Sequence, residues 1–139
     1  MPYKNINPTL WGPHLWRFMH YTTLSYPENP TEEDKLIMTN FFNSVKHILP
    51  CEKCRYNFKN HLETKPLNDE ILSDNVKLIK WLYNIHNEVN KSTNKQPLEY
   101  DKFIKMYSVK PQKCDIFNEK TILMIGIILT IVCLIIFNR

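Results

Sequence analysis

Two cysteines three residues apart, Cys51 and Cys54, are the residues of this sequence best suited to chemistry. Pro50 precedes them and favours the start of a helix, because its φ is already helical and it needs no N–H partner there. Cys51 would then lie in the first turn, where free backbone N–H groups and the helix dipole favour a thiolate. Cys54 would follow one turn deeper on nearly the same face, with Phe58 four residues further on. The pair could form a disulfide across one helical turn or hold a metal ion.

The spacing of the two cysteines leaves several kinds of site open. A zinc site needs two further ligands; His47 and His61 flank the pair, but no second Cys-x-x-Cys and no His-x3–5-His motif follows. A thioredoxin-like redox site needs a βαβ context, which the sequence does not predict. A dithiol that works with a flavin on a helical scaffold is a third interpretation. The spacing favours redox chemistry and leaves metal-binding and structural roles as alternatives.

The composition indicates a helical protein with one modest core. The chain has 139 residues and only two glycines, and strand-rich folds usually need more glycine in their turns. The net charge of +4 is spread over a sequence in which acidic and basic residues alternate, which argues against nucleic-acid binding. Four cysteines are too few for a disulfide-stapled secreted scaffold, and residues 1–7 lack the apolar stretch of a signal peptide.

Hydrophobic periodicity and capping residues predict an all-α fold, a small four-helix bundle with a short fifth helix. The expected helices span about residues 9–25, 31–48, 51–62, 74–90 and 98–107. Thr31 is the predicted N-cap of the second helix, and Ser73 or Asp74 that of the fourth. The predicted buried stripe of the second helix is Ile37, Phe41, Val45 and Ile48. That of the fourth helix is Ile79, Leu82, Ile85, His86 and Val89.

The C-terminal part of the chain predicts a membrane segment. Residues 121–137 form an uncharged apolar run at the short end of the transmembrane range, and a buried core helix would normally show a polar face. The sequence ends two residues later, so we expect a single-pass tail anchor. Three lysines at positions 110, 113 and 120 precede the run and one arginine follows it, which weakly places the N-terminal domain in the cytosol.

Three segments, taken in order, resemble the Erv/ALR family of FAD-linked sulfhydryl oxidases, most of all its members from large DNA viruses. Residues 11–20, WGPHLWRFMH, are similar to the opening helix of that family. Residues 50–54, PCEKC, resemble its redox centre, and residues 55–62 continue in the same register. Residues 86–91, HNEVNK, with Lys95 beyond them, resemble its flavin-binding segment.

The resemblance implies an FAD-binding sulfhydryl oxidase domain over residues 1–107, joined by a linker, residues 108–120, to the tail anchor. It also implies a homodimer. The implied cofactor contacts are Gly12, Leu15, Trp16, His20, His86, Asn87, Val89, Asn90, Lys91 and Lys95. The sequence has no Gly-x-Gly-x-x-Gly motif, so side chains must meet the phosphates, and Lys91 and Lys95 are suited to this. For Trp11, core packing and a place beside the ring systems are equally favoured.

The resemblance further implies that Cys51 and Cys54 are catalytic. A thiolate of a substrate protein attacks their disulfide, and two electrons pass through FAD to oxygen, which becomes hydrogen peroxide. Cys51, at the tip of the helix, is the expected interchange thiol, and Cys54 the expected electron donor to FAD.

Two departures from the family pattern change these expectations. Tyr83 and Tyr100 stand where many members have a structural disulfide, so packing must hold the last helix. No second Cys-x-x-Cys is present to act as a shuttle, only Cys114 and Cys133, so we expect a separate dithiol carrier protein. The alternative function is a non-enzymatic, membrane-anchored helical adaptor with a zinc or structural disulfide site.

Overall fold

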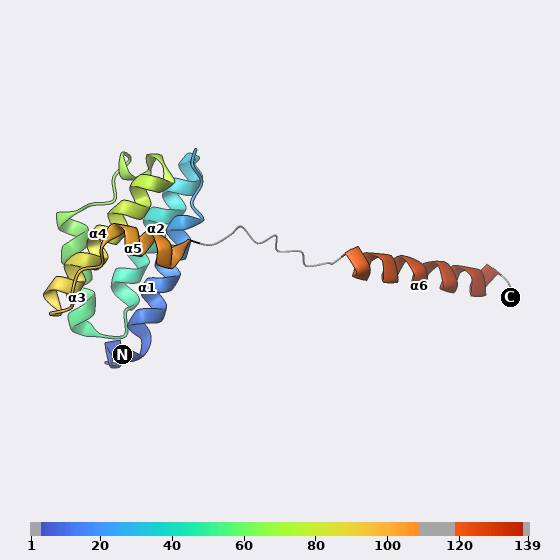
Figure 1. The fold of residues 1–139 in the computed structure, drawn as a ribbon, viewed down its shortest axis with the longest axis horizontal. Coiled ribbons are helices and arrows are strands. Elements are labelled where there is room, and N and C mark those ends of the chain that lie inside the picture. The colour runs from blue at the N-terminus through green and yellow to red at the C-terminus, as the bar shows by residue number, and fades with distance from the viewer. Residues whose placement is uncertain (1–3, 109–118, 138–139) are drawn as a thin grey trace. The chain divides into compact units, whose positions relative to one another are not determined.

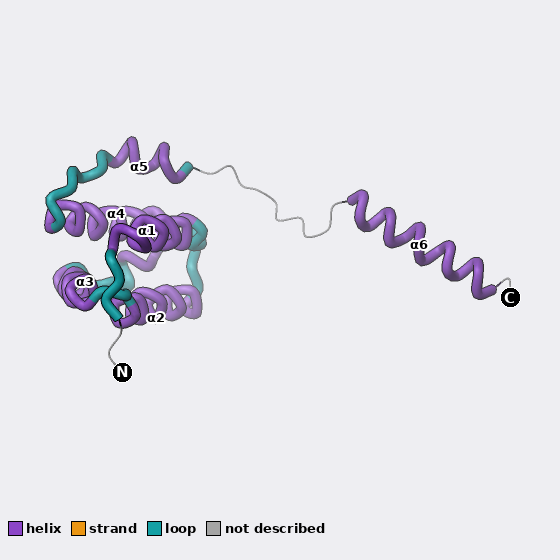
Figure 2. The backbone as a smooth tube through the Cα atoms, turned by 90° about the horizontal axis from the view of Figure 1, so that it is seen from below, coloured by secondary structure: helices purple, strands orange, loops and turns teal. Residues whose placement is uncertain are grey.

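The computed structural model describes residues 4–108 and 119–137, and the regular secondary structure in them is entirely helical (Figure 1). The chain divides into two units, residues 1–107 and 108–139. The first contains α1 (Pro8–Leu24), α2 (Glu32–Ile48), α3 (Glu52–Thr64), the 3-10 turn η1 (Ile71–Ser73), α4 (Asn75–Ser92) and α5 (Tyr100–Tyr107). The prediction of an all-α fold is confirmed. Figure 2 shows α5 beside α1 and α4, on the side away from α2 and α3.

Side-chain caps fix where the helices of the first unit begin. The Asn7 side chain accepts a hydrogen bond from the Thr9 N–H at 3.0 Å, and Pro8 takes the first helical position of α1. Thr31 and Asp34 form a reciprocal capping box at the start of α2. Of the two caps predicted for α4, Asp74 is the one used, and it accepts from the Lys77 N–H at 2.8 Å. The N-caps of α2 and α4 therefore agree with the prediction.

The core lies between α1, α2, α3 and α4, and the predicted stripe of α2 is only partly right: Val45 is buried as predicted, and Phe41 packs partly buried against the core. Ile37 and Ile48 are exposed, whereas the buried side chains of α2 are Met38, Phe42 and Val45. Both series have helical periodicity, so only the packing of α2 against its neighbours distinguishes them. In α4 the prediction was better, and the buried residues are Leu78, Ile79, Trp81, Leu82 and Ile85.

Hydrogen bonds and aromatic packing attach α5 to α4. The amide of Asn87 accepts from the Leu98 N–H at 2.9 Å and donates to the Leu98 carbonyl at 3.0 Å. The Tyr83 hydroxyl donates to the same carbonyl at 2.7 Å, and the Tyr83 and Tyr100 rings lie 5.1 Å apart. The predicted start of this helix at Leu98 is corrected to Tyr100, because the backbone of Leu98 is engaged with α4. Non-covalent contacts thus join α5 to α4 at Tyr83 and Tyr100, the two positions for which the resemblance implied that packing must hold the last helix.

The second unit contains one described helix, α6 (Glu119–Phe137). In the described ranges, none of the helices combines the length and apolar character that membrane crossing requires. The transmembrane segment predicted at residues 121–137 therefore has no support from the structure. Residues 109–118, most of the predicted linker, lie outside the described residues, and so does Cys114.

Replacing Asn87 by alanine should destabilise the first unit. The variant leaves the Leu98 N–H without its partner, and a lost partner for a partly buried polar group costs about 2 kcal/mol. Urea unfolding of the full chain measures the change. Asn84→Ala is the matched control, because Asn84 is exposed on the same helix. Equal unfolding midpoints for the two variants would contradict the role given to Asn87.

Candidate active site

The sequence-predicted cysteine pair forms a disulfide at the N-terminus of α3, with the two Cα atoms 5.1 Å apart. Cys51 is the N-cap residue, not the first helical residue, and its backbone is extended. Its Sγ accepts a hydrogen bond from the Cys54 N–H at 3.2 Å. The Cys54 N–H therefore points at the sulfur of Cys51, and with the positive end of the helix dipole it stabilises negative charge there.

Contacts from distant and neighbouring residues fix the segment before the disulfide. The Arg55 guanidinium donates to the Leu49 carbonyl at 2.5 Å. The Ile6 N–H donates to the Pro50 carbonyl at 2.7 Å, and the Asn5 side chain accepts from the Glu52 N–H at 2.8 Å. Residues 5 and 6 are thus attached to the segment that carries the disulfide, although no local pattern in the sequence predicts this contact.

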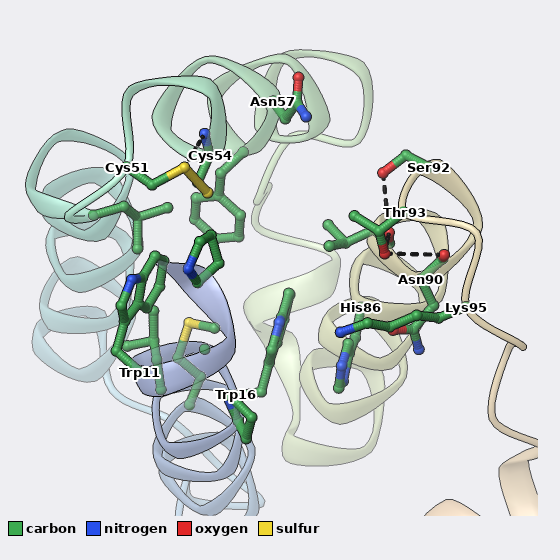
Figure 3. A pocket seen from close by; sticks show the side chains of 18 of the residues that line it. Trp11, Trp16, Cys51, Cys54, Asn57, His86, Asn90, Ser92, Thr93 and Lys95 are labelled. Carbon is green, nitrogen blue, oxygen red and sulfur yellow. Dashed lines mark hydrogen bonds between the residues drawn. A yellow bond between two sulfur atoms is a disulfide. The ribbon is translucent and has the colours of Figure 1, made fainter. Parts of the chain in front are cut away.

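A cavity of about 590 Å³ lies beside the disulfide, and both Cys51 and Cys54 line it. Figure 3 shows the disulfide and Trp11 on one side of the cavity and the end of α4, with Asn90 and Lys95, on the other. Both the size and the mixed aromatic and polar lining are typical of a site for an organic cofactor.

Stacked aromatic rings from α1 and α4 form one wall of this cavity. The rings of Trp16 and His86 lie 3.9 Å apart and 5° from parallel. Behind them, Nε2 of the fully buried His20 lies 2.9 Å from Nδ1 of His86, within hydrogen-bond distance. The Nδ1 atom of His20 has no hydrogen-bond partner among the described residues. The wall therefore offers flat faces, backed by a buried polar pair.

Burial keeps both histidine rings uncharged at neutral pH. Desolvation lowers the pKa of His20 to about 3, with a smaller contribution from His86. Desolvation also lowers the pKa of His86 to about 4, and the neighbouring charge of Lys95 acts in the same direction. Two neutral rings can form the hydrogen bond between them, because the nitrogen of one ring carries a proton and donates while the nitrogen of the other accepts.

The turn after α4 determines which lysine faces the cavity. Asn94 adopts a left-handed conformation, with φ at 55°, and the Lys95 N–H bonds back to the Asn90 carbonyl at 2.8 Å. This hydrogen-bond pattern is a Schellman motif, and it reverses the chain so that Lys95 lines the cavity. Lys91 instead pairs with Glu88 at 3.4 Å on the surface of the helix.

The structure brings most of the sequence-predicted cofactor residues to this cavity. Those that line it are Gly12, Leu15, Trp16, His86, Val89, Asn90 and Lys95. Three predicted residues do not line it: His20 lies behind His86, Asn87 binds Leu98, and Lys91 pairs with Glu88. The partners of His20 and Asn87 are distant in sequence, so residue type and spacing do not reveal them, whereas Lys91 and Glu88 form an i,i+3 pair that the spacing allows.

Other lining residues were missed or left undecided by the sequence analysis. They include Trp11, Arg17, Lys53, Asn57, Ser92, Thr93 and Asn94. For Trp11 the sequence favoured core packing and cofactor contact equally, and the structure places it in the cavity lining. Its indole N–H donates to the Ile6 carbonyl at 3.2 Å. Lys53 lies inside the Cys-x-x-Cys motif, so its place could have been inferred from the motif itself. In the described part of the chain no cluster of three or more His, Cys, Asp or Glu could hold a metal ion.

Known proteins are similar to this chain both in sequence and in fold. The sequence profile of the Erv1/Alr family covers residues 13–108. A "Probable FAD-linked sulfhydryl oxidase R368" of Acanthamoeba polyphaga mimivirus is 45% identical over 115 residues, which cover 81% of this chain and 80% of the relative. A "Putative FAD-linked sulfhydryl oxidase 096R" of Invertebrate iridescent virus 3 is 30% identical over 105 residues, covering 76% and 70% of the two chains. The crystal structure of the FAD-binding domain of Erv1 from Saccharomyces cerevisiae aligns with a TM-score of 0.68 at 26% identity, covering 74% of this chain and 95% of that domain.

The stability of the first unit should fall as the pH is lowered from 6.5 to 5. In the unfolded chain histidine titrates near a pKa of 6.5, whereas His20 and His86 stay neutral in the folded state down to about pH 4. The unfolded state therefore binds more protons in this window, and the stabilisation present above pH 6.5 is lost toward acid. Urea unfolding at several pH values measures the slope.

His20→Asn should make this slope shallower. The control is His47→Asn, because His47 is exposed on α2. The window lies above the range in which ordinary carboxyl groups titrate, so they contribute little to it. An unchanged slope in the His20 variant would show that its burial does not control the acid sensitivity.

Proposed function

The chain belongs to the Erv1/Alr family, and from this premise we propose that it is an FAD-dependent thiol oxidase that forms disulfide bonds in substrate proteins. The observation that carries the proposal is the position of the Cys51–Cys54 disulfide on the edge of the aromatic cavity. A disulfide there can exchange with a thiol outside and lies beside the space for a redox cofactor.

The residues of the cavity fit FAD. Its volume of about 590 Å³ is within the usual range for cofactor sites. Trp11, Trp16 and His86 offer faces for ring systems, and Lys95 with Lys53 offers positive charge for phosphates. Bound FAD would supply an acceptor for the electron pair of the dithiol and a route from it to oxygen, which would give hydrogen peroxide.

The cysteines carry out the exchange with the substrate. A substrate thiolate attacks Sγ of Cys51, the Cys51–Cys54 bond breaks, and Cys54 leaves as a thiolate with the electron pair. A second substrate thiolate then attacks the substrate sulfur of the mixed disulfide, and Cys51 leaves as a thiolate. The substrate dithiol has lost two electrons and two protons, and the Cys51–Cys54 pair has gained the two electrons.

The different surroundings of the two sulfurs support separate roles. Cys51 is the N-cap of α3 and borders a second, outer cavity as well as the inner one. Cys54 borders the inner cavity and packs against the core. We therefore assign substrate exchange to Cys51 and electron donation toward the cofactor to Cys54.

The partners and the location rest on the family and the sequence. We infer a separate dithiol carrier protein, because neither Cys133 nor Cys114 belongs to a second Cys-x-x-Cys motif. A homodimer is inferred from the family alone. The uncharged run at residues 121–137 supports a proposed membrane tail with the catalytic domain on the cytosolic side.

Purified full-length protein should be yellow and should consume oxygen when a small dithiol such as dithiothreitol is added. Cys51→Ser and Cys54→Ser should both lose this turnover, because the disulfide cannot form. Cys133→Ser is the control and should keep it, because Cys133 is exposed and unpaired. A colourless protein without dithiol-driven oxygen uptake would contradict the oxidase and favour the adaptor.

An absorbance spectrum distinguishes the two cysteines. Cys51→Ser should show a long-wavelength charge-transfer band with FAD bound, because it leaves the Cys54 thiolate beside the cofactor site. Cys54→Ser should lack this band and should still form a mixed disulfide with substrate. The band in Cys54→Ser instead would reverse the assignment.

From the proposed membrane tail we expect the full chain to float with lipid vesicles in a density gradient. Ile128→Lys combined with Leu129→Lys should abolish flotation, since each buried lysine in the middle of a span costs roughly 3 kcal/mol. The conservative control Ile128→Leu should float. Vesicle binding that survives the two lysines would place the membrane contact outside this run.

A further inference from the structure

An open groove of about 620 Å³ lies between the N-terminal segment and the first turn of α3. We call it the outer groove. Its lining residues are Asn5, Ile6, Asn7, Pro8, Cys51, Glu52, Lys53 and Tyr56. Cys51 lines both this groove and the inner cavity, whereas Cys54 is absent from the lining of the groove. The groove is therefore continuous with the sulfur that the proposed function exposes to substrate.

Hydrogen bonds hold the wall of the groove in place. The Ile6 N–H binds the Pro50 carbonyl at 2.7 Å, and the Asn5 side chain binds the Glu52 N–H at 2.8 Å. On its other side the Ile6 carbonyl accepts from the Trp11 indole at 3.2 Å. Contacts to the disulfide segment and to α1 fix this wall before a ligand binds. The conformational entropy lost on binding is therefore smaller.

The lining of the groove indicates which kind of segment it can recognise. Glu52 and Lys53 carry opposite charges, so net charge does not select the ligand. Ile6 is 46% exposed and Tyr56 is 66% exposed, although both are large apolar side chains beside the reactive sulfur. Burial of such side chains by a partner is favourable, and aromatic anchors often dominate the affinity of an interface.

We propose that the outer groove binds an extended, cysteine-bearing segment of the substrate protein, with Ile6 and Tyr56 against an apolar residue next to the reacting cysteine. The proposal rests on the thiol oxidase function. An incoming thiolate must approach Cys51 along the line of the disulfide, from the side away from Cys54. The inner cavity is assigned to the cofactor, so the groove is the described depression through which a polypeptide can bring a thiol to Cys51.

Two reduced peptides test the groove with the full-length, FAD-loaded protein. Each has two cysteines, and they differ only in a leucine or a serine beside the first cysteine. Oxygen uptake gives kcat/KM for each peptide and for dithiothreitol. The unaltered protein should prefer the leucine peptide, and the combined variant Ile6→Ser/Tyr56→Ala should lower the ratio of kcat/KM for this peptide to that for dithiothreitol about tenfold, mainly through KM.

The control is Val76→Ser, because Val76 is 60% exposed on α4 and lines neither cavity. It should keep the ratio of the unaltered protein. An unchanged ratio in the groove variant, or an equal fall for peptide and dithiothreitol, would overturn the groove while leaving the oxidase function intact. No dithiothreitol turnover by the unaltered protein would overturn the oxidase function, and the groove proposal with it.

Discussion

The contact between α1 and α4 is the interaction on which the rest of the site depends. Trp16 of α1 stacks on His86 of α4, and the buried ring of His20 lies within hydrogen-bond distance of His86. Charging either histidine would remove an ion from most of its water, and that of His20 from all of it, so burial keeps both rings neutral. Trp16 and His86 form a wall of the cavity, and His20 packs behind them between the helices. The stability of the domain and the shape of the cavity are therefore linked through these residues.

The N-terminus of α3 determines how the disulfide meets its surroundings. Because Cys51 is the N-cap, its sulfur lies at the end of the helix and borders two cavities. Cys54, one turn inside, packs against the core. A single turn of helix thus separates a sulfur that borders both the outer groove and the inner cavity from one that borders the inner cavity and the core. The N-terminal segment, attached through Asn5 and Ile6 although it is distant in sequence, completes this arrangement.

Hydrogen bonds and ring packing attach α5 to α4. Asn87 and Tyr83 direct three hydrogen bonds to the backbone of Leu98, and Tyr100 packs against Tyr83. This attachment brings Phe103 and Tyr107 against the ring of His20. The buried histidine is therefore covered by a helix that no disulfide holds. The shielding of His20 from water depends on hydrogen bonds that urea or a mutation can weaken, with no disulfide to be reduced first.

The sequence by itself determined the local features: the helical class, the cap at Thr31, a cap for α4 at Ser73 or Asp74, and the closeness of Cys51 and Cys54 at the start of a helix. These depend on residues within one or two turns of each other, so their spacing along the chain is sufficient. Only the tertiary structure decided which face of α2 is buried, since Ile37 and Met38 continue equally good helical stripes. It also decided that Asn87 binds Leu98 and that Asn5, 47 residues away, caps Glu52. Such choices depend on partners that folding brings together, and the residue type alone does not specify them.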